Sequence, residues 1–230
     1  MNSDIFKNTV SAEKQVHDDY LVKIVEKPGA KIKLLMIGNS IIRHEPKEEI
    51  GWFHDWGMAA SDISKDFAHV TIDLIEKKLG QPVNYCIVHL SRWEYLYWQD
   101  EILNDFQKAR DYKADIVICR VGENCWAARD KLSDIDLYPH FDKMVKFFIS
   151  NPNAQVICSD LFWPFEPVDN VIHKVWETNP SYKTVKLGDL GQRDDCKALN
   201  EYWHSGVRIH PNDLGMKLIA ERLVDKVEKI

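Results

Sequence analysis

Three segments of the sequence carry side chains that could act together as nucleophile, proton acceptor and hydrogen-bond donor. Ser40 ends a Gly-Asn-Ser segment, Asn124 ends a Gly-Glu-Asn segment, and His210 stands directly before a proline. A serine hydroxyl becomes an effective nucleophile when an imidazole accepts its proton. A carboxamide N–H can stabilise the negative charge that develops during such an attack. The three side chains therefore indicate covalent catalysis by serine, if the fold brings them together.

Short apolar runs recur along the chain and predict the elements that position these side chains. Five runs predict buried strands, at residues 31–38, 82–90, 114–121, 155–161 and 184–190. Apolar residues with helical spacing lie at residues 57–78, 98–109, 141–148 and 214–227. Continuous apolar strands that alternate with helices are typical of a parallel sheet covered on both faces. The pattern predicts a three-layer α/β/α fold, with a flavodoxin-like, doubly wound sheet of five parallel strands.

The predicted sheet places the three segments at one rim. In a doubly wound sheet with strand order 2-1-3-4-5, the order reverses between the first and third strands, and ligands bind at the carboxyl ends there. Ser40 follows the first strand and Asn124 follows the third. His210 comes after the fifth strand, directly before the closing helix. We therefore expect nucleophile, donor and base to converge from three strand ends.

Length and composition limit the classes of function. A chain of 230 residues suits one α/β domain, and we expect residues 31–230 to form it, with residues 1–30 as an N-terminal extension packed on it. A net charge of −6 without a Lys/Arg cluster argues against nucleic acid or an anionic membrane as partner. No apolar run reaches the roughly 18 residues that span a bilayer, and the first residues lack the apolar core of a signal peptide. Five cysteines without a close pair indicate free thiols, so we expect a cytoplasmic location.

The sequence resembles the SGNH (GDSL-like) hydrolases in short blocks that follow the family's order from Ile32 to the C-terminus. Residues 38–41 (Gly-Asn-Ser-Ile) stand where the family has Gly-Asp-Ser-Leu. Residues 122–125 (Gly-Glu-Asn-Cys) match the Gly-x-Asn-Asp block without its final Asp, and residues 210–212 (His-Pro-Asn) match the family's His-Pro block. The second block normally brings a glycine, whereas residues 89–92 (His-Leu-Ser-Arg) contain none. The order of the blocks on the predicted strands makes the set more specific than any one block.

The resemblance implies acyl transfer from an ester to water. Ser40 would attack the carbonyl, with His210 as general base and then general acid. The oxyanion would be held by the backbone N–H groups of Ser40 and of the Ser91–Arg92 turn, and by the Asn124 side chain. Each residue also has a purely structural alternative, because Ser and Asn often occupy turns and helix caps and a loop His can simply be packed.

The resemblance also exposes a missing residue. The family pattern has an Asp three residues before the His, where this chain has Val207. Three groups could orient the imidazole instead: the carboxylate of Asp189, the carboxylate of Glu123, or a main-chain carbonyl, most simply that of residue 207. We favour the carbonyl, because it stays in place whatever the side chain and can accept the Nδ1–H of His210.

Tryptophans cluster after the predicted strand ends. Of eight in the chain, five follow the predicted rim: Trp52, Trp56, Trp93, Trp126 and Trp163. Aromatic faces suit a sugar ring or an acyl chain, so Trp52, Trp93 and Trp163 are candidate substrate-binding residues and a carbohydrate ester is the favoured substrate class. The alternative is that the rings close the core beneath long loops. Residues 41–58 form a long connection that could cover the site as a lid.

The leading hypothesis is a serine esterase that removes a small acyl group such as acetyl from a small-molecule or carbohydrate ester, with the oligomeric state left open. The alternative is a catalytically weak or silent relative that binds a carbohydrate or acylated ligand, and a third interpretation is a phosphate or nucleotide binder that shares only the fold. No metal-ligand spacing, P-loop or Gly-x-Gly-x-x-Gly segment occurs, so we expect no metal and no cofactor. The Gly-x-Ser-x-Gly segment of α/β-hydrolases is absent as well.

Overall fold

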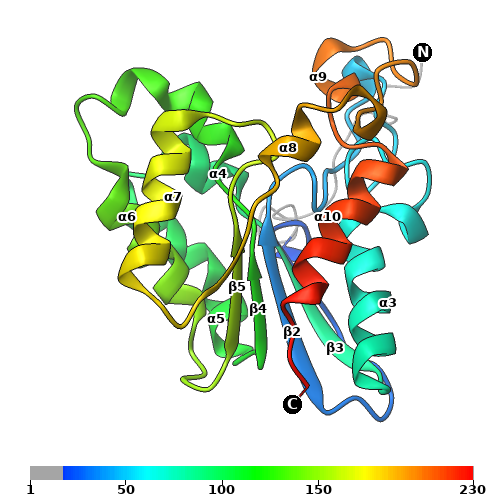
Figure 1. The fold of residues 1–230 in the computed structure, drawn as a ribbon, viewed down its shortest axis with the longest axis vertical. Coiled ribbons are helices and arrows are strands. Elements are labelled where there is room, and N and C mark those ends of the chain that lie inside the picture. Colours follow the sequence, from blue (N-terminus) through cyan, green and yellow to red (C-terminus); the bar gives the residue numbers. More distant parts are fainter. Residues whose placement is uncertain (1–17, 230) are drawn as a thin grey trace, which may run out of the picture.

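The computed structural model of the protein describes residues 18–229, which form a six-stranded sheet between two layers of helices (Figure 1). Its spatial strand order is β1-β3-β2-β4-β5-β6. The strands are β1 (Val22–Val25), β2 (Ile32–Gly38), β3 (Val83–His89), β4 (Ile116–Cys119), β5 (Gln155–Ser159) and β6 (Lys183–Val185). The strands β2 to β6 run parallel, which confirms the predicted fold class.

The order of the five parallel strands agrees with the predicted 2-1-3-4-5 order, because β2 lies between β3 and β4. The last strand is shorter than the predicted segment 184–190. It ends at Val185, and after Lys186 and Leu187 the chain enters α8 (Gly188–Gly191).

The sixth strand, β1, comes from the segment expected to be an extension. It pairs antiparallel with the edge of β3, with Val22 opposite Val88. The run Val-Lys-Ile-Val is too short to predict a strand by itself, but its pairing covers backbone groups of β3 that an open edge would leave exposed. Residues 22–25 of this segment are therefore built into the sheet, and residues 1–17 lie outside the described residues.

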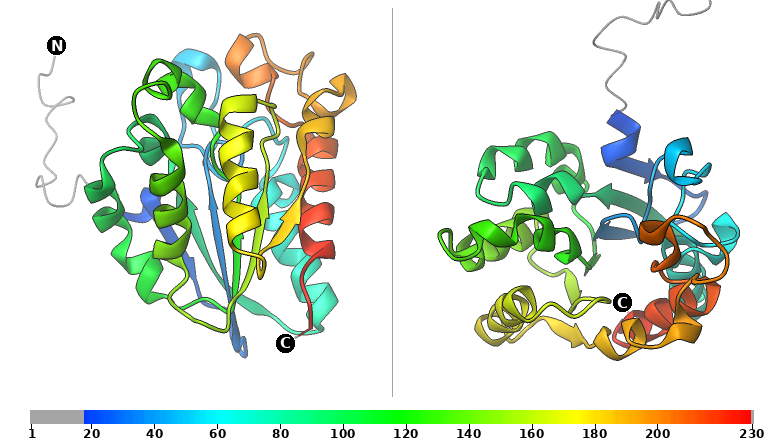
Figure 2. Two further views of the ribbon diagram at one scale, coloured as in Figure 1. Left: turned by 60° about the vertical axis from the view of Figure 1, so that its left-hand side comes forward. Right: turned by 90° about the horizontal axis from the view of Figure 1, so that it is seen from above.

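Helices cover both faces of the sheet (Figure 2). On one face lie α3 (Phe67–Leu79) and α10 (Asp213–Asp225). On the other lie α4 (Ser91–Tyr95), α5 (Gln107–Asp111), α6 (Leu137–Phe148) and α7 (Glu166–Thr178). The remaining short helices are α2 (Asp18–Leu21), α9 (Ser205–Arg208) and 3-10 helices at Glu48–Ile50, Ile63–Lys65, Asp100–Phe106, Glu123–Lys131 and Asp194–Cys196.

Strand β2 is apolar on both sides because it lies between two cores. Leu35 and Ile37 belong to the core under α6 and α7, whereas Leu34 and Met36 belong to the core under α3 and α10. All four side chains are fully buried. Burial on both faces explains why the strand is a continuous apolar run, since successive side chains point to opposite faces.

The helix predicted at 57–78 begins only at Phe67, because Asp66 caps it. The Asp66 carboxylate accepts a hydrogen bond from the backbone N–H of His69 at 2.7 Å and another from that of Gly57 at 3.2 Å. The second bond ties α3 to the connection that returns toward β2, where the Met58 N–H donates to the carbonyl of Ser40.

Among residues 18–229, no helix combines the length and apolar character needed to cross a membrane.

We predict that Asp66→Ala lowers the free energy of unfolding by about 2–4 kcal/mol. The loss combines a helix cap with a buried Gly57 N–H that is left without its acceptor. Urea unfolding followed by circular dichroism measures it. The control is Asp62→Ala, which removes the cap of the exposed Ile63–Lys65 turn and should cost less than about 1 kcal/mol. Equal losses in the two variants would contradict the anchoring role of Asp66.

Candidate active site

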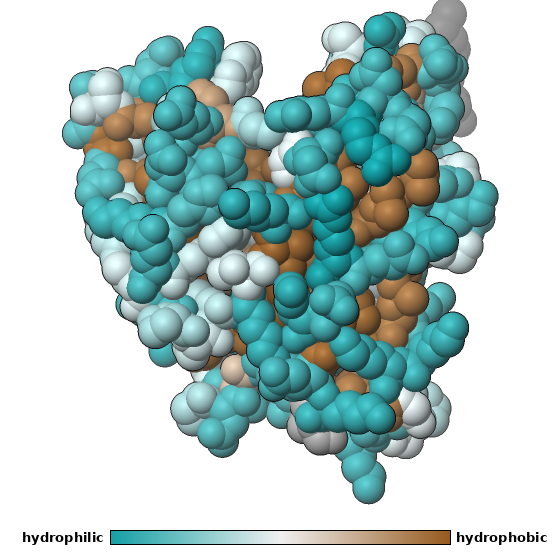
Figure 3. All heavy atoms as spheres, in the orientation of Figure 1, coloured by the Kyte–Doolittle hydropathy of each residue, from teal (hydrophilic) through white to brown (hydrophobic). Residues whose placement is uncertain are grey.

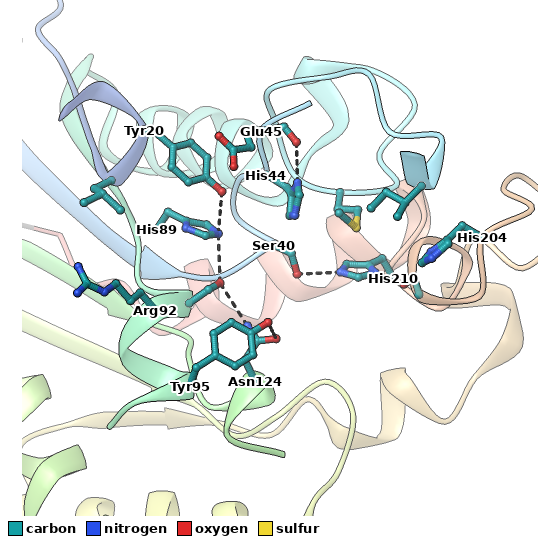
Figure 4. A pocket seen from close by; sticks show the side chains of 15 residues that line it. Tyr20, Ser40, His44, Glu45, His89, Arg92, Tyr95, Asn124, His204 and His210 are labelled. Carbon is teal, nitrogen blue, oxygen red and sulfur yellow. Dashed lines mark hydrogen bonds between the residues drawn. The ribbon is translucent and has the colours of Figure 1, made fainter. Parts of the chain in front are cut away.

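Ser40 and His210 meet at the carboxyl ends of the parallel strands. Ser40 Oγ lies 2.8 Å from His210 Nε2 (Figure 4). Ser40 directly follows β2 in a tight turn, in which the carbonyl of Asn39 accepts the N–H groups of Ile42 and Arg43. A Cβ on Gly38 would come within 2.9 Å of the Ile42 side chain, so glycine permits this turn. Two residues separated by 170 positions are thus brought into hydrogen-bond contact.

The His210 ring is oriented by main chain. Its Nδ1 lies 2.7 Å from the carbonyl oxygen of Gly206. A carbonyl can only accept, so Nδ1 carries the proton, and in the neutral ring Nε2 is free to accept the hydroxyl proton of Ser40. Burial lowers the pKa of His210 to about 4, which keeps the imidazole neutral at physiological pH.

The acceptor is the carbonyl of Gly206, one residue before the position that the sequence suggested. The carbonyl of Val207 is occupied, since it accepts the backbone N–H of His210 at 3.0 Å. The helical turn of α9 places the Gly206 carbonyl four residues before the ring. On the other side, Asn212 caps α10 by accepting the N–H of Gly215, which fixes the backbone that follows His210.

The two carboxylates considered for this role have other partners. Asp189 forms a two-fold contact with the guanidinium of Arg222, at 2.5 and 2.7 Å. Glu123 pairs with Arg120 and accepts the side-chain N–H of Asn39 at 2.7 Å. Within residues 18–229, the ring nitrogens of His210 bond to Ser40 and to Gly206 rather than to a carboxylate.

Asn124 lies beside Ser91 at the same rim. Its Nδ2 donates to Ser91 Oγ at 3.2 Å and to Glu94 Oε2 at 2.6 Å, while its Oδ1 accepts the hydroxyl of Tyr95 at 3.2 Å. Ser91 opens α4, and the first N–H groups of a helix have no intrahelical acceptor. The side-chain N–H of Asn124 and the backbone N–H of Ser91 are therefore donors suited to an anionic oxygen formed near Ser40.

Two residues that sequence reasoning missed support this arrangement. Glu94 is fully buried below Asn124, and His89 lies at the end of β3 with its Nε2 3.1 Å from Ser91 Oγ and 3.2 Å from the Tyr20 hydroxyl. Burial lowers the pKa of His89 to about 3, so its ring is neutral. Glu94 is the single charged residue in the run Trp-Glu-Tyr-Leu-Tyr-Trp, and this is the signal that could have identified it.

Two pockets meet at Ser40, Asn124 and His210. The first, which we call the histidine pocket, has a volume of about 410 Å³, and its walls include His44, His89, His204, Tyr20 and Tyr95. The second, the tryptophan pocket, has a volume of about 560 Å³, and its walls include Trp126, Trp163, Phe165 and Ile209. The space-filling view shows the molecule hollowed between the side that carries α6 and α7 and the side that carries α9 (Figure 3).

Only part of the predicted aromatic lining reaches these pockets. Trp163 lines the tryptophan pocket with its ring centre 5.0 Å from that of His210, and Trp126 lies in the same wall. Trp52 and Trp93 are fully buried, so the expectation that they bind substrate is wrong. Trp93 packs edge-on against Phe141 in the core, because α4 turns this face toward the sheet.

Residues 41–58 contribute one wall of the histidine pocket, through His44, Glu45, Ile50 and Met58. Within the segment the backbone N–H of His44 donates to the carbonyl of Trp56, and the indole N–H of Trp52 donates to the carbonyl of His44. The segment therefore lies beside Ser40 as a packed wall, and opening as a lid stays a prediction. No group of three or more His, Cys, Asp or Glu side chains among residues 18–229 is arranged to hold a metal ion.

Comparison with solved structures identifies the fold, whereas no family model and no curated protein matches the sequence. A protein from Parabacteroides merdae assigned to the GDSL-like lipases aligns with a TM-score of 0.57 at 13% identity, over 85% of this chain and 95% of that chain. A family 3 carbohydrate esterase from Clostridium thermocellum aligns with a TM-score of 0.53 at 14% identity, over 83% and 92%. A variant of an acetyl-xylooligosaccharide esterase from Geobacillus aligns with a TM-score of 0.50 at 17% identity, over 88% of this chain and 98% of that chain. The chain thus has the fold of these proteins, as its sequence blocks indicated.

We predict that the His210 ring stays neutral, with its proton on Nδ1, from about pH 5 to about pH 8. Nitrogen-15 NMR of the imidazole distinguishes both the tautomer and the charge. Asp189→Asn should leave the His210 resonances unchanged, because Asp189 is paired with Arg222. A proton on Nε2, a midpoint near the ordinary value of about 6.5, or a change in the Asp189 variant would contradict orientation by the Gly206 carbonyl.

Proposed function

We propose that this protein is a serine esterase that transfers a small acyl group, such as acetyl, from an ester to water. The observation that carries the proposal is the 2.8 Å contact between Ser40 Oγ and His210 Nε2, in a ring whose other nitrogen is held by a carbonyl. The lone pair that faces the hydroxyl is therefore available as a base. The fold adds support, since proteins that share it include lipases and carbohydrate esterases.

In the proposed reaction His210 Nε2 takes the Ser40 proton while Oγ forms a bond to the ester carbonyl carbon. The carbonyl oxygen becomes an oxyanion that accepts N–H groups of Asn124 and Ser91. Collapse of the adduct breaks the bond to the alcohol oxygen, which leaves with the proton from His210. A water molecule then gives its proton to the same nitrogen and attacks the acyl-enzyme, and the acid product departs as Ser40 regains its proton.

The substrate class is inferred from the tryptophan pocket. Trp163 stands against the His210 ring, where the general acid must reach the leaving alcohol. An indole face at that place suits the apolar face of a sugar ring. We therefore propose a carbohydrate as the alcohol and a short acyl chain as the acid.

All five cysteines are buried free thiols, which supports a reducing compartment such as the cytoplasm.

We predict that Ser40→Ala and His210→Ala each lower kcat for 4-nitrophenyl acetate by on the order of 10³–10⁶-fold, because the two side chains act as one proton-transfer unit. A fluorophosphonate probe should add its mass to Ser40 of the wild type. Equal hydrolysis by wild type and Ser40→Ala would refute the serine mechanism. A wild type that neither turns over nor is labelled, but binds a carbohydrate, would support the catalytically silent alternative.

We predict that Trp163→Ala raises KM for an acetylated oligosaccharide by roughly 10-fold, while KM for 4-nitrophenyl acetate changes less than about 3-fold. The larger ester loses the indole face that only it reaches. Trp203→Ala is the matched control, because Trp203 is 72% exposed and lies in neither pocket. The same change for both substrates, or the same change in the control, would contradict a sugar subsite at Trp163.

A further inference from the structure

Glu94 is a fully buried carboxylate that receives only N–H donors. Its Oε1 accepts the side-chain N–H of Asn39 at 3.0 Å, the backbone N–H of Gly122 at 2.5 Å and that of Asn124 at 3.4 Å. Its Oε2 accepts the side-chain N–H of Asn124 at 2.6 Å. The residue thus joins the turn after β2, the turn after β4 and the carboxamide at the rim.

An ionised carboxylate is the form that fits this set of partners. A carboxylate is acceptor-only, whereas a protonated carboxyl group carries an O–H and an amide carries an NH₂. Protonation of Glu94, or its substitution by Gln, would turn a donor toward an N–H of Asn39, Gly122 or Asn124. The buried donor would then lose its acceptor, which is costly where no water can replace it.

The charge of Glu94 also selects the orientation of the Asn124 carboxamide. With Glu94 ionised, Nδ2 points down to Oε2 and its second hydrogen points to Ser91 Oγ at the rim. A neutral Glu94 would favour the flipped amide, because its O–H could donate to Oδ1. The flip would place an acceptor oxygen where the reaction develops negative charge, and such an orientation repels an oxyanion.

We propose that ionised Glu94 is a positioning residue, which holds the Asn124 N–H toward the reacting carbonyl oxygen, and that protonation of Glu94 switches hydrolysis off. The inference rests on the proposed esterase function and on the contacts of Glu94, and it deepens that function by naming a pH-dependent support of the oxyanion site.

The surroundings of Glu94 favour a switch near neutral pH. Burial is the largest effect and, with the neighbouring Glu123 carboxylate, raises the pKa of Glu94 to about 7, against the lowering by its hydrogen bonds. Glu123 is paired with Arg120. The other titratable groups around Glu94 are Tyr95, Cys119 and Cys125, and their raised pKa values keep them uncharged there.

The sign of the pH effect follows directly. A carboxylate with a pKa of about 7 gains its proton as the pH falls through that value, so the competent form exists above it. His210, with a pKa of about 4, remains a neutral base throughout this range. A loss of activity with a midpoint near 7 therefore belongs to Glu94 rather than to the general base.

The pH dependence of kcat and KM for 4-nitrophenyl acetate, from about pH 5 to about pH 9, tests the proposal in wild type and Glu94→Gln. We expect wild-type kcat to fall on the acid side of a midpoint near 7. Glu94→Gln should lower kcat roughly 10–100-fold with little change in KM, and should abolish that midpoint. Asp66→Asn is the matched control, a buried carboxylate outside the site, and should keep the wild-type profile. A wild type without the midpoint, or a Glu94 variant that retains it, overturns the proposal.

A second variant covers the case in which Glu94→Gln does not fold. Glu123→Gln removes the like charge beside Glu94, so the acid midpoint should move down by roughly one pH unit. An unchanged midpoint in that variant contradicts Glu94 as its origin.

A spectroscopic measurement separates this proposal from the proposed function. The side-chain amide resonances of Asn124, assigned by their loss in Asn124→Ala, should shift with a midpoint near pH 7 in wild type but not in Glu94→Gln. No shift in wild type, or the same shift in the variant, overturns the positioning role even if esters are hydrolysed. Conversely, a protein that shows the shift but hydrolyses no ester retains the switch and refutes the esterase.

Discussion

Parallel pairing of β2 with β4 is the constraint on which the arrangement of the site depends. The pairing sets Ile37 beside Cys119, so β2 and β4 end at the same level of the sheet. The turn that carries Ser40 and the turn that carries Asn124 then begin side by side. β3 pairs with the other edge of β2 and ends at His89, which brings Ser91 to the same rim. A shift of one residue in either pairing would turn β2 side chains into the opposite core and separate Ser40 from Asn124 and Ser91.

The buried charges below the rim explain a departure from the family pattern. The family has an Asp where this chain has Asn39, directly before the nucleophile. The Asn39 amide donates to both Glu94 and Glu123, so an Asp there would place a third carboxylate against two others. Such a cluster would be strongly repulsive at low dielectric. In this chain the two carboxylates stand on neighbouring elements, and the Asn39 amide joins them through its two N–H donors, with Arg120 supplying the opposite charge.

The features that depend on long sequence patterns, such as the parallel sheet, could be predicted from the sequence. The features that depend on the direction or partner of one side chain could not. The parallel sheet was predicted from continuous apolar runs and its strand order from the doubly wound fold that they indicate, and the approach of His210 to Ser40 was predicted from their positions after strand ends. Trp52 and Trp93 were assigned to a pocket because they follow strand ends in the chain. Whether such a residue lines a pocket or packs in the hydrophobic core depends on the direction of its side chain, and both are buried. Glu94 stands out in sequence only as a lone charge in an aromatic run, and its role depends on contacts with Asn39, Gly122 and Asn124, which lie far from it in the chain. Gly206 supplies the acceptor for His210 because of the geometry of one helical turn, and a pattern of residue types does not predict which carbonyl of that turn faces the ring.

In the proposed esterase reaction, orientation of His210 by a carbonyl shifts catalytic work from the general base to the oxyanion site. A carboxylate partner would stabilise the imidazolium of His210, whereas the Gly206 carbonyl offers only a dipole. A pKa of about 4 in place of the ordinary value means that protonating the buried ring costs about 3 kcal/mol more than in water. The transition state of the proposed reaction would recover that cost from the contact of the imidazolium with the adduct and from the donors around the oxyanion. In the proposed reaction Asn124 and Ser91 would therefore carry a larger share of catalysis than in a complete triad, and fixing the Asn124 amide would be correspondingly important. The proposal thus links Val207 to Glu94: the base has a carbonyl partner in place of a carboxylate, and the proposed oxyanion site has a buried carboxylate beneath it.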